Sequence, residues 1–140
     1  MLPLRCVLLV DDDPTLLFLH RRLLAQLDVA AHVLEAANGH EALAFIHAQC
    51  TDDFRTCPDL ILLDLHMPVM DGFAFLAAYR ALPEAQQCAK VVTMLTTSLN
   101  TDDLERAAQL SVSAYLSKPL TAEKLHTLVR DHFVAPAPFN

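Results

Sequence analysis

The chain is poor in glycine, with only Gly39 and Gly72 among its 140 residues. A dinucleotide-binding G-x-G-x-x-G loop and a Walker-type phosphate loop both need more glycine at fixed spacing, so the sequence excludes them. Any phosphate chemistry must therefore rely on side chains and a bound metal ion.

Basic blocks and long apolar runs are also missing. Lysine and arginine together number 10 against 17 acidic residues, and the formal net charge is −7, which argues against direct binding of nucleic acid. No apolar run approaches the roughly 20 residues of a membrane helix, and the apolar start is too short for a signal peptide. We therefore expect a cytoplasmic protein that binds neither nucleic acid nor membranes.

The four cysteines contain no C-x-x-C pair, and the seven histidines are scattered along the chain. Cys6 lies in an apolar run, where a small buried thiol is the simplest interpretation. Cys50 and Cys57 lack the paired spacing of a zinc site. These residues indicate a reduced chain, and a metal site or phosphohistidine relay built on the histidines is not expected.

Short apolar runs alternate with amphipathic stretches. The predicted strands are 5–10, 31–36, 58–65, 89–98 and 113–117, and the predicted helices are 14–27, 40–50, 73–82, 101–110 and 121–133. This alternation predicts an α/β fold, a doubly wound (βα)5 three-layer sandwich with a five-stranded parallel sheet. We expect one domain, residues 1–133, and a short tail, 134–140, with no attached effector. The first helix carries a stripe of leucines at positions 16, 17, 19, 23, 24 and 27.

Polar residues end the predicted strands. These residues are Asp11, Asp12 and Asp13 after the first strand, Asp64 in the third, Thr96 and Thr97 in the fourth, and Lys118 after the fifth. In parallel α/β sheets the ligand site lies beyond the carboxyl ends of the strands. Carboxylates about 4 Å apart repel each other by roughly 1–4 kcal/mol, and oxygen ligands suit Mg²⁺. The pattern predicts a divalent cation site, with Asp13 facing away as the cap of a helix that starts at Pro14.

The motifs VLLVDDDP, NGHEAL, PDLILLDLHMPVMDG, VVTMLTTS and AYLSKPL together resemble the receiver domain of bacterial two-component response regulators, over about residues 4–133. The chain looks most like the chemotaxis-type, stand-alone receivers. The resemblance implies the flavodoxin-like strand order 2-1-3-4-5. It also implies a phosphoacceptor in phosphorelay signalling that depends on Mg²⁺ (or Mn²⁺), not a metabolic enzyme.

The resemblance implies partners as well. The phosphodonor would be a sensor histidine kinase or a histidine phosphotransfer protein. The output would be contact with a downstream protein or a second copy of the chain, through the face formed by the fourth helix, fifth strand and fifth helix.

Individual roles in phosphorylation also follow from the resemblance. Asp64 corresponds to the phosphoacceptor, Asp12 to a direct metal ligand, and Asp11 to a ligand that acts largely through water. Asp64 and the backbone carbonyl of His66 would complete the metal site. Lys118 would pair with Asp64 and later with a phosphoryl oxygen.

Four further residues correspond to the family's switch and to the turn after Lys118. Thr96 would be the switch hydroxyl that binds the phosphoryl group, with Thr97 beside it as the alternative. Tyr115 would be the aromatic residue that turns inward when the hydroxyl moves. Pro119 would follow a cis peptide bond.

A second interpretation of LLVDDDPT is the D-x-D-x-T motif of haloacid-dehalogenase-type phosphatases. In these, Asp11 would be the nucleophile and Asp13 the general acid/base. The reaction needs a further acidic metal-binding motif after the lysine. Past Lys118, however, only Glu123 and Asp131 remain, inside a predicted helix.

Overall fold

The computed structural model describes residues 4–49, 57–83, 87, 89, 91–96, 100–110 and 112–133. Strands and helices alternate in these ranges: β1 (Leu4–Val10), α1 (Pro14–Leu27), β2 (Ala30–Ala36), α2 (Gly39–Gln49), β3 (Leu60–Asp64), α3 (Gly72–Arg80), β4 (Val91–Thr96), α4 (Thr101–Gln109), β5 (Ala114–Ser117) and α5 (Ala122–His132). The predicted alternation is confirmed, with boundaries that shift by a few residues. The expected tail, 134–140, lies outside the described residues.

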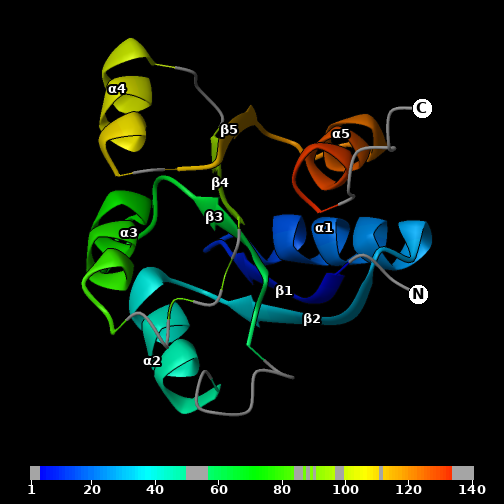
Figure 1. Cartoon of the computed structure of the whole chain (residues 1–140), viewed down its shortest axis with the longest axis horizontal. Coiled ribbons are helices and arrows are strands. Elements are labelled where there is room, and N and C mark those ends of the chain that lie inside the picture. The colour runs from blue at the N-terminus through cyan, green and yellow to red at the C-terminus, as the bar shows by residue number, and fades with distance from the viewer. Residues whose placement is uncertain are drawn as a thin grey trace, which may run out of the picture.

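The strands form one parallel sheet in the order β2-β1-β3-β4-β5, as the resemblance implied. In Figure 1, α2, α3 and α4 lie on one side of the sheet and α1 and α5 on the other. Every residue of β3 is buried, which is expected of a central strand covered on both faces. None of the described helices is both long enough and apolar enough to cross a membrane.

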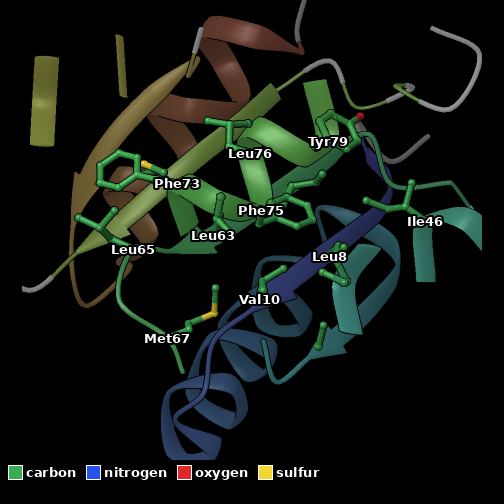
Figure 2. Close-up of a cluster of buried hydrophobic side chains, with 14 of the residues drawn as sticks. Leu8, Val10, Ile46, Leu63, Leu65, Met67, Phe73, Phe75, Leu76 and Tyr79 are labelled. Atoms are coloured by element: carbon green, nitrogen blue, oxygen red, sulfur yellow. The ribbon is translucent and has the colours of Figure 1, made fainter. Parts of the chain in front are cut away.

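Two hydrophobic clusters fill the space between the sheet and its helices. Because side chains alternate along a strand, Leu8 and Val10 of β1 face the α2 and α3 side, whereas Val7 and Leu9 face the α1 and α5 side. Figure 2 shows the first cluster, in which aromatic and aliphatic side chains of α3 pack on β1 and β3. This packing fixes the carboxyl ends of the two central strands relative to each other.

Helix α1 packs most of the predicted leucine stripe against the core, with Leu19 as the exposed exception. Leu19 is 48% exposed, whereas His20 and Leu24 are buried and Leu17 packs partly against the core. The core-facing side of the helix therefore combines His20 with the predicted Leu17, Leu23, Leu24 and Leu27. The leucine pattern was wrong at position 19 because a histidine takes a core position, where its ring has a hydrogen-bond partner.

The cysteines differ from the expectation at one position. Cys6 is a buried free thiol, as predicted. Burial, reinforced by the charge of Asp59, raises the pKa of that thiol to about 11. Cys57 is buried and disulfide-bonded, so the expectation of a fully reduced chain does not hold there. Cys50 and Cys88 lie outside the described residues.

Candidate functional site

The carboxyl ends of β1 and β3 bring three aspartates together. Val10 pairs with Leu63 in the parallel register, so Asp11, which follows Val10, lies beside the end of β3. Carboxylate oxygens of Asp11, Asp12 and Asp64 all lie within 4.8 Å of one another. Asp11 and Asp64 are only 4% and 5% exposed, whereas Asp12 is open to solvent. The strand ends thus form an acidic cluster with one open side.

Lys118 reaches this acidic cluster from the end of β5. Its Nζ lies 2.8 Å from Asp11 Oδ2 and 2.8 Å from Asp64 Oδ1. The lysine side chain is only 7% exposed, so water screens these ion pairs weakly. The pair with Asp64 was expected. The pair with Asp11 was not, because it depends on how far the lysine side chain reaches past β4 and β3 to the end of β1.

The charges of the cluster do not balance. Burial raises the pKa of the Asp64 carboxyl, and the hydrogen bond from Lys118 opposes this rise without cancelling it. Burial alone would lower the pKa of Lys118, but hydrogen bonds to Asp11 and Asp64 raise it above its ordinary value. Lys118 is therefore charged at neutral pH. One ammonium faces three carboxylate groups, so a further positive charge would stabilise the cluster.

The donor set of this cluster fits a magnesium ion. All three side chains offer oxygen, the ligand atom that Mg²⁺ prefers, and the exposed side of Asp12 leaves room for the waters that Mg²⁺ retains. His66, two residues beyond Asp64, has an exposed side chain. The resemblance predicts that the backbone carbonyl of His66 binds the metal ion, and this role stays a prediction.

Asp13 is the N-cap of α1. Its Oδ1 accepts hydrogen bonds from the backbone N–H groups of Thr15 at 2.9 Å and Leu16 at 3.4 Å. Its own N–H donates to Asp11 Oδ1 at 2.9 Å. The phosphatase interpretation needs Asp13 as a general acid/base, but its carboxylate caps the helix and is not part of the acidic cluster. The structure gives that interpretation no support.

Thr96 and Tyr115 lie on the two strands beside the acidic cluster. Thr96 ends β4 and is buried, and its backbone oxygen accepts a 2.6 Å hydrogen bond from the Lys118 N–H. The Tyr115 hydroxyl is buried. Burial raises its pKa, as does the charge of Asp103 on α4, and its proximity to the Thr96 side chain opposes this rise. Thr97, the alternative switch residue, lies outside the described residues.

Two residues to which the sequence analysis gave no role at the site hold the backbone next to Lys118. His20 Nε2 accepts a 3.2 Å hydrogen bond from the Leu120 N–H. Lys124 Nζ donates to carbonyl oxygens on both sides of Lys118. The Lys118–Pro119 peptide bond between these contacts is cis. A histidine on the leucine-rich helix was a signal that could have found His20, whereas Lys124 looks like any surface lysine.

The pKa of His20 predicts a pH effect on stability. Burial lowers this pKa below 6.5, with Asp11 opposing the shift and Lys118 adding to it. As pH falls below about 6.5, the unfolded chain binds a proton at His20 more readily than the folded chain does, so stability falls. Above that pH the contribution is constant. His20→Gln, which keeps an acceptor but does not titrate, should flatten the slope of unfolding free energy between about pH 5 and 7.

Urea unfolding at several pH values in EDTA measures this slope without interference from a bound cation. His126→Gln removes an exposed histidine from α5 and is the matched control. Equal slopes for the wild type and His20→Gln would contradict the assignment.

Comparison with known proteins gives a consistent family match. Residues 7–130 match the family model of the response regulator receiver domain. Response regulator Rcp1 of Synechocystis sp. (strain ATCC 27184 / PCC 6803 / Kazusa) is 32% identical over 128 residues, which cover 91% of this chain and 86% of that protein.

Solved structures agree in fold. Chemotaxis protein CheY4 of Vibrio cholerae is 30% identical with a TM-score of 0.74, over 91% of this chain and 98% of that one. The phosphorylated cyanobacterial phytochrome response regulator RcpA is 30% identical with a TM-score of 0.70, over 91% of this chain and 89% of that one. Each similarity therefore spans nearly the whole chain.

Proposed function

Because this chain belongs to the family of response regulator receiver domains, whose members accept phosphoryl groups in two-component signalling, we propose that Asp64 is its phosphoacceptor. One observation carries the assignment. The Asp64 carboxylate is buried at the end of β3, 2.8 Å from the Lys118 ammonium and within 4.8 Å of two other carboxylates. A carboxylate placed in this way can act as a nucleophile toward a phosphoryl group whose charge the same site neutralises.

The transfer needs few protein groups. One Asp64 oxygen attacks phosphorus as the bond from phosphorus to the donor's imidazole nitrogen breaks, and the bonding electron pair leaves with the imidazole. Lys118 then exchanges its contact with Asp64 Oδ1 for a phosphoryl oxygen and stabilises the developing charge. The product is an aspartyl phosphate. In this sense the domain assists its own phosphorylation.

Receiver domains bind Mg²⁺ at an acidic pocket, and the residues that would hold the ion here are Asp11, Asp12, Asp64 and the backbone carbonyl of His66. A bound Mg²⁺ supplies positive charge to the phosphoryl oxygens. Asp11 also receives the Lys118 ammonium. A water-mediated role for Asp11, with Asp12 as the direct ligand on the open side, is compatible with that pairing.

The change that phosphorylation causes at the protein-binding surface depends on Thr96 and Tyr115. The aspartyl phosphate adds strong acceptor oxygens beside β4, and the Thr96 hydroxyl can donate to one of them. Movement of Thr96 changes the surroundings of the buried Tyr115 hydroxyl on β5. The switched surface is the α4-β5-α5 face, which would bind a downstream protein or a second copy of the chain. Leu104 of α4, a large apolar side chain that is 41% exposed, supports a contact surface there.

The phosphodonor is a sensor histidine kinase or a histidine phosphotransfer protein. Helix α1 starts beside the acidic cluster and exposes Phe18 and Leu19 to solvent. Exposed apolar side chains next to a reaction site are suited to docking a protein donor. The proposed location is the cytoplasm, although the Cys57 disulfide is typical of oxidising surroundings.

Small-molecule phosphorylation tests the proposal. The protein is incubated with acetyl phosphate and Mg²⁺, with EDTA in a parallel sample, and bound phosphate is measured by intact-mass spectrometry. The wild type should gain one phosphoryl group with Mg²⁺ and none in EDTA. Asp64→Asn should gain none, because an amide oxygen is a much weaker nucleophile than a carboxylate.

Asp13→Asn is the matched control for the phosphatase interpretation. Asparagine also caps helices well, so this variant should fold and become phosphorylated like the wild type. Labelling that survives Asp64→Asn but disappears in Asp11→Asn would overturn the assignment of Asp64.

A further inference from the structure

The backbone that carries Lys118 is held by side chains from two different helices. We call residues 117–120 the Lys118 segment. Lys124 of α5 donates from Nζ to Ser117 O at 2.8 Å, Ser117 Oγ at 3.0 Å and Pro119 O at 3.2 Å. An ammonium group has three donors, so Lys124 is fully used by this segment.

The other end of the Lys118 segment contacts α1. Leu120 N–H donates to His20 Nε2 at 3.2 Å, and both residues are buried. Between these contacts, Lys118 N–H donates to Thr96 O at 2.6 Å. The backbone is therefore fixed before, at and after Lys118, by groups from α5, β4 and α1.

This support matters because the Lys118 side chain is long and must meet two acceptors at once. Its Nζ lies 2.8 Å from oxygens of both Asp11 and Asp64. A four-carbon side chain has many rotamers, so the position of its Cα decides whether the ammonium can bridge both carboxylates. A displacement of about 1 Å in a reacting group can reduce a rate by about 100-fold.

We propose that His20 and Lys124 are positioning residues for Lys118 in phosphoryl transfer. Neither touches the reacting atoms. Each instead fixes the Lys118 segment, so that the ammonium is positioned to contact the phosphoryl oxygens. The inference rests on the proposed function. It adds two residues to those that the proposed function already assigns.

Four variants separate positioning from general stability. Lys124→Met and His20→Leu remove the donor and the acceptor at similar size, whereas Lys124→Arg and His20→Gln keep a donor and an acceptor. Arg130→Met makes the same kind of change as Lys124→Met at an exposed site of α5. For each variant, the maximal rate and the half-saturating acetyl phosphate concentration are measured with Mg²⁺, per folded molecule as found by urea unfolding.

Lys124→Met and His20→Leu should lower the maximal rate by roughly 10- to 100-fold, and the half-saturating concentration should change little. Lys124→Arg and His20→Gln should recover most of the rate, and Arg130→Met should match the wild type. A purely structural role would lower the folded fraction and leave the rate per folded molecule unchanged, which would overturn the proposal.

A double-variant comparison tests whether the effect passes through Lys118. When Lys118 is already methionine, adding Lys124→Met should cause little further loss. An undiminished loss in that background would contradict positioning. If the wild type itself gains no phosphate on Asp64, the proposed function fails. If it gains phosphate and Lys124→Met and His20→Leu react at the wild-type rate, only the positioning proposal fails.

Discussion

Replacing Lys118 with methionine is expected to lower the free energy of unfolding of the metal-free protein by about 3 kcal/mol at neutral pH. The lysine is nearly buried and pairs with Asp11 and Asp64 at 2.8 Å each. Without it, two buried carboxylates face each other with no cation between them. Breaking such an ion pair from one side is costly because the remaining charge stays buried.

Magnesium should reverse part of this loss. The variant retains all three carboxylates but lacks the ammonium, so a divalent cation should stabilise it more than it stabilises the wild type. Phosphorylation should nevertheless remain slower by about 100-fold or more, because the donor to the phosphoryl oxygen is gone. Urea unfolding with EDTA and with Mg²⁺ measures the first effect, and labelling by acetyl phosphate measures the second.

Arg130→Met is the control for the loss of a cation, because Arg130 and its partner Asp131 are exposed. An exposed pair contributes about 1 kcal/mol at most. If Lys118→Met were as stable as this control in EDTA, the lysine would not be compensating the buried carboxylates.

The sequence was sufficient to predict the fold and the location of the candidate site. The alternation of short apolar runs with amphipathic stretches predicted a parallel α/β sheet, and such a sheet brings the carboxyl ends of its strands to one edge. The sequence alone could therefore place Asp11, Asp64 and Lys118 at the same edge of the sheet. The helix cap at Asp13 could also be predicted from neighbouring residues, because an aspartate directly before a proline is typical of a helix start.

Contacts made by long or unusual side chains could not be predicted in the same way. The pair between Lys118 and Asp11 depends on side-chain reach, which spacing along the chain does not encode. The bonds of Lys124 depend on where a turn places carbonyl oxygens. His20 occupies a core position because a backbone N–H happens to face it. These contacts arise between elements, so they become visible only once the elements have packed.

Gly72→Ala is expected to lower the free energy of unfolding by about 2–3 kcal/mol. A Cβ atom at Gly72 would stand 2.6 Å from Asp64 O and 3.0 Å from Leu65 Cα, both of which are backbone atoms. The first turn of α3 cannot simply move away, because Gly72 N–H donates to Leu65 O at 2.9 Å. Either α3 or the end of β3 must therefore shift.

This shift of α3 or β3 should also slow phosphoryl transfer. Displacing the Asp64 carbonyl moves the residue that carries the proposed nucleophile, so the rate of phosphorylation per folded molecule should fall by roughly 10-fold or more. Urea unfolding and acetyl phosphate labelling of the same preparation measure stability and rate separately.

Gly39→Ala distinguishes local displacement of Asp64 from a general loss of packing. A Cβ atom at Gly39 would meet Met70 Cγ and Phe75 Cβ at 2.9 Å and Met70 O at 3.0 Å. That change also strains the packing, but no atom of Asp64 is among its nearest neighbours. Both variants should lose stability, and only Gly72→Ala should lose rate per folded molecule. Equal losses of rate would mean that the phosphoacceptor responds to packing on this face as a whole and not to its contact with Gly72.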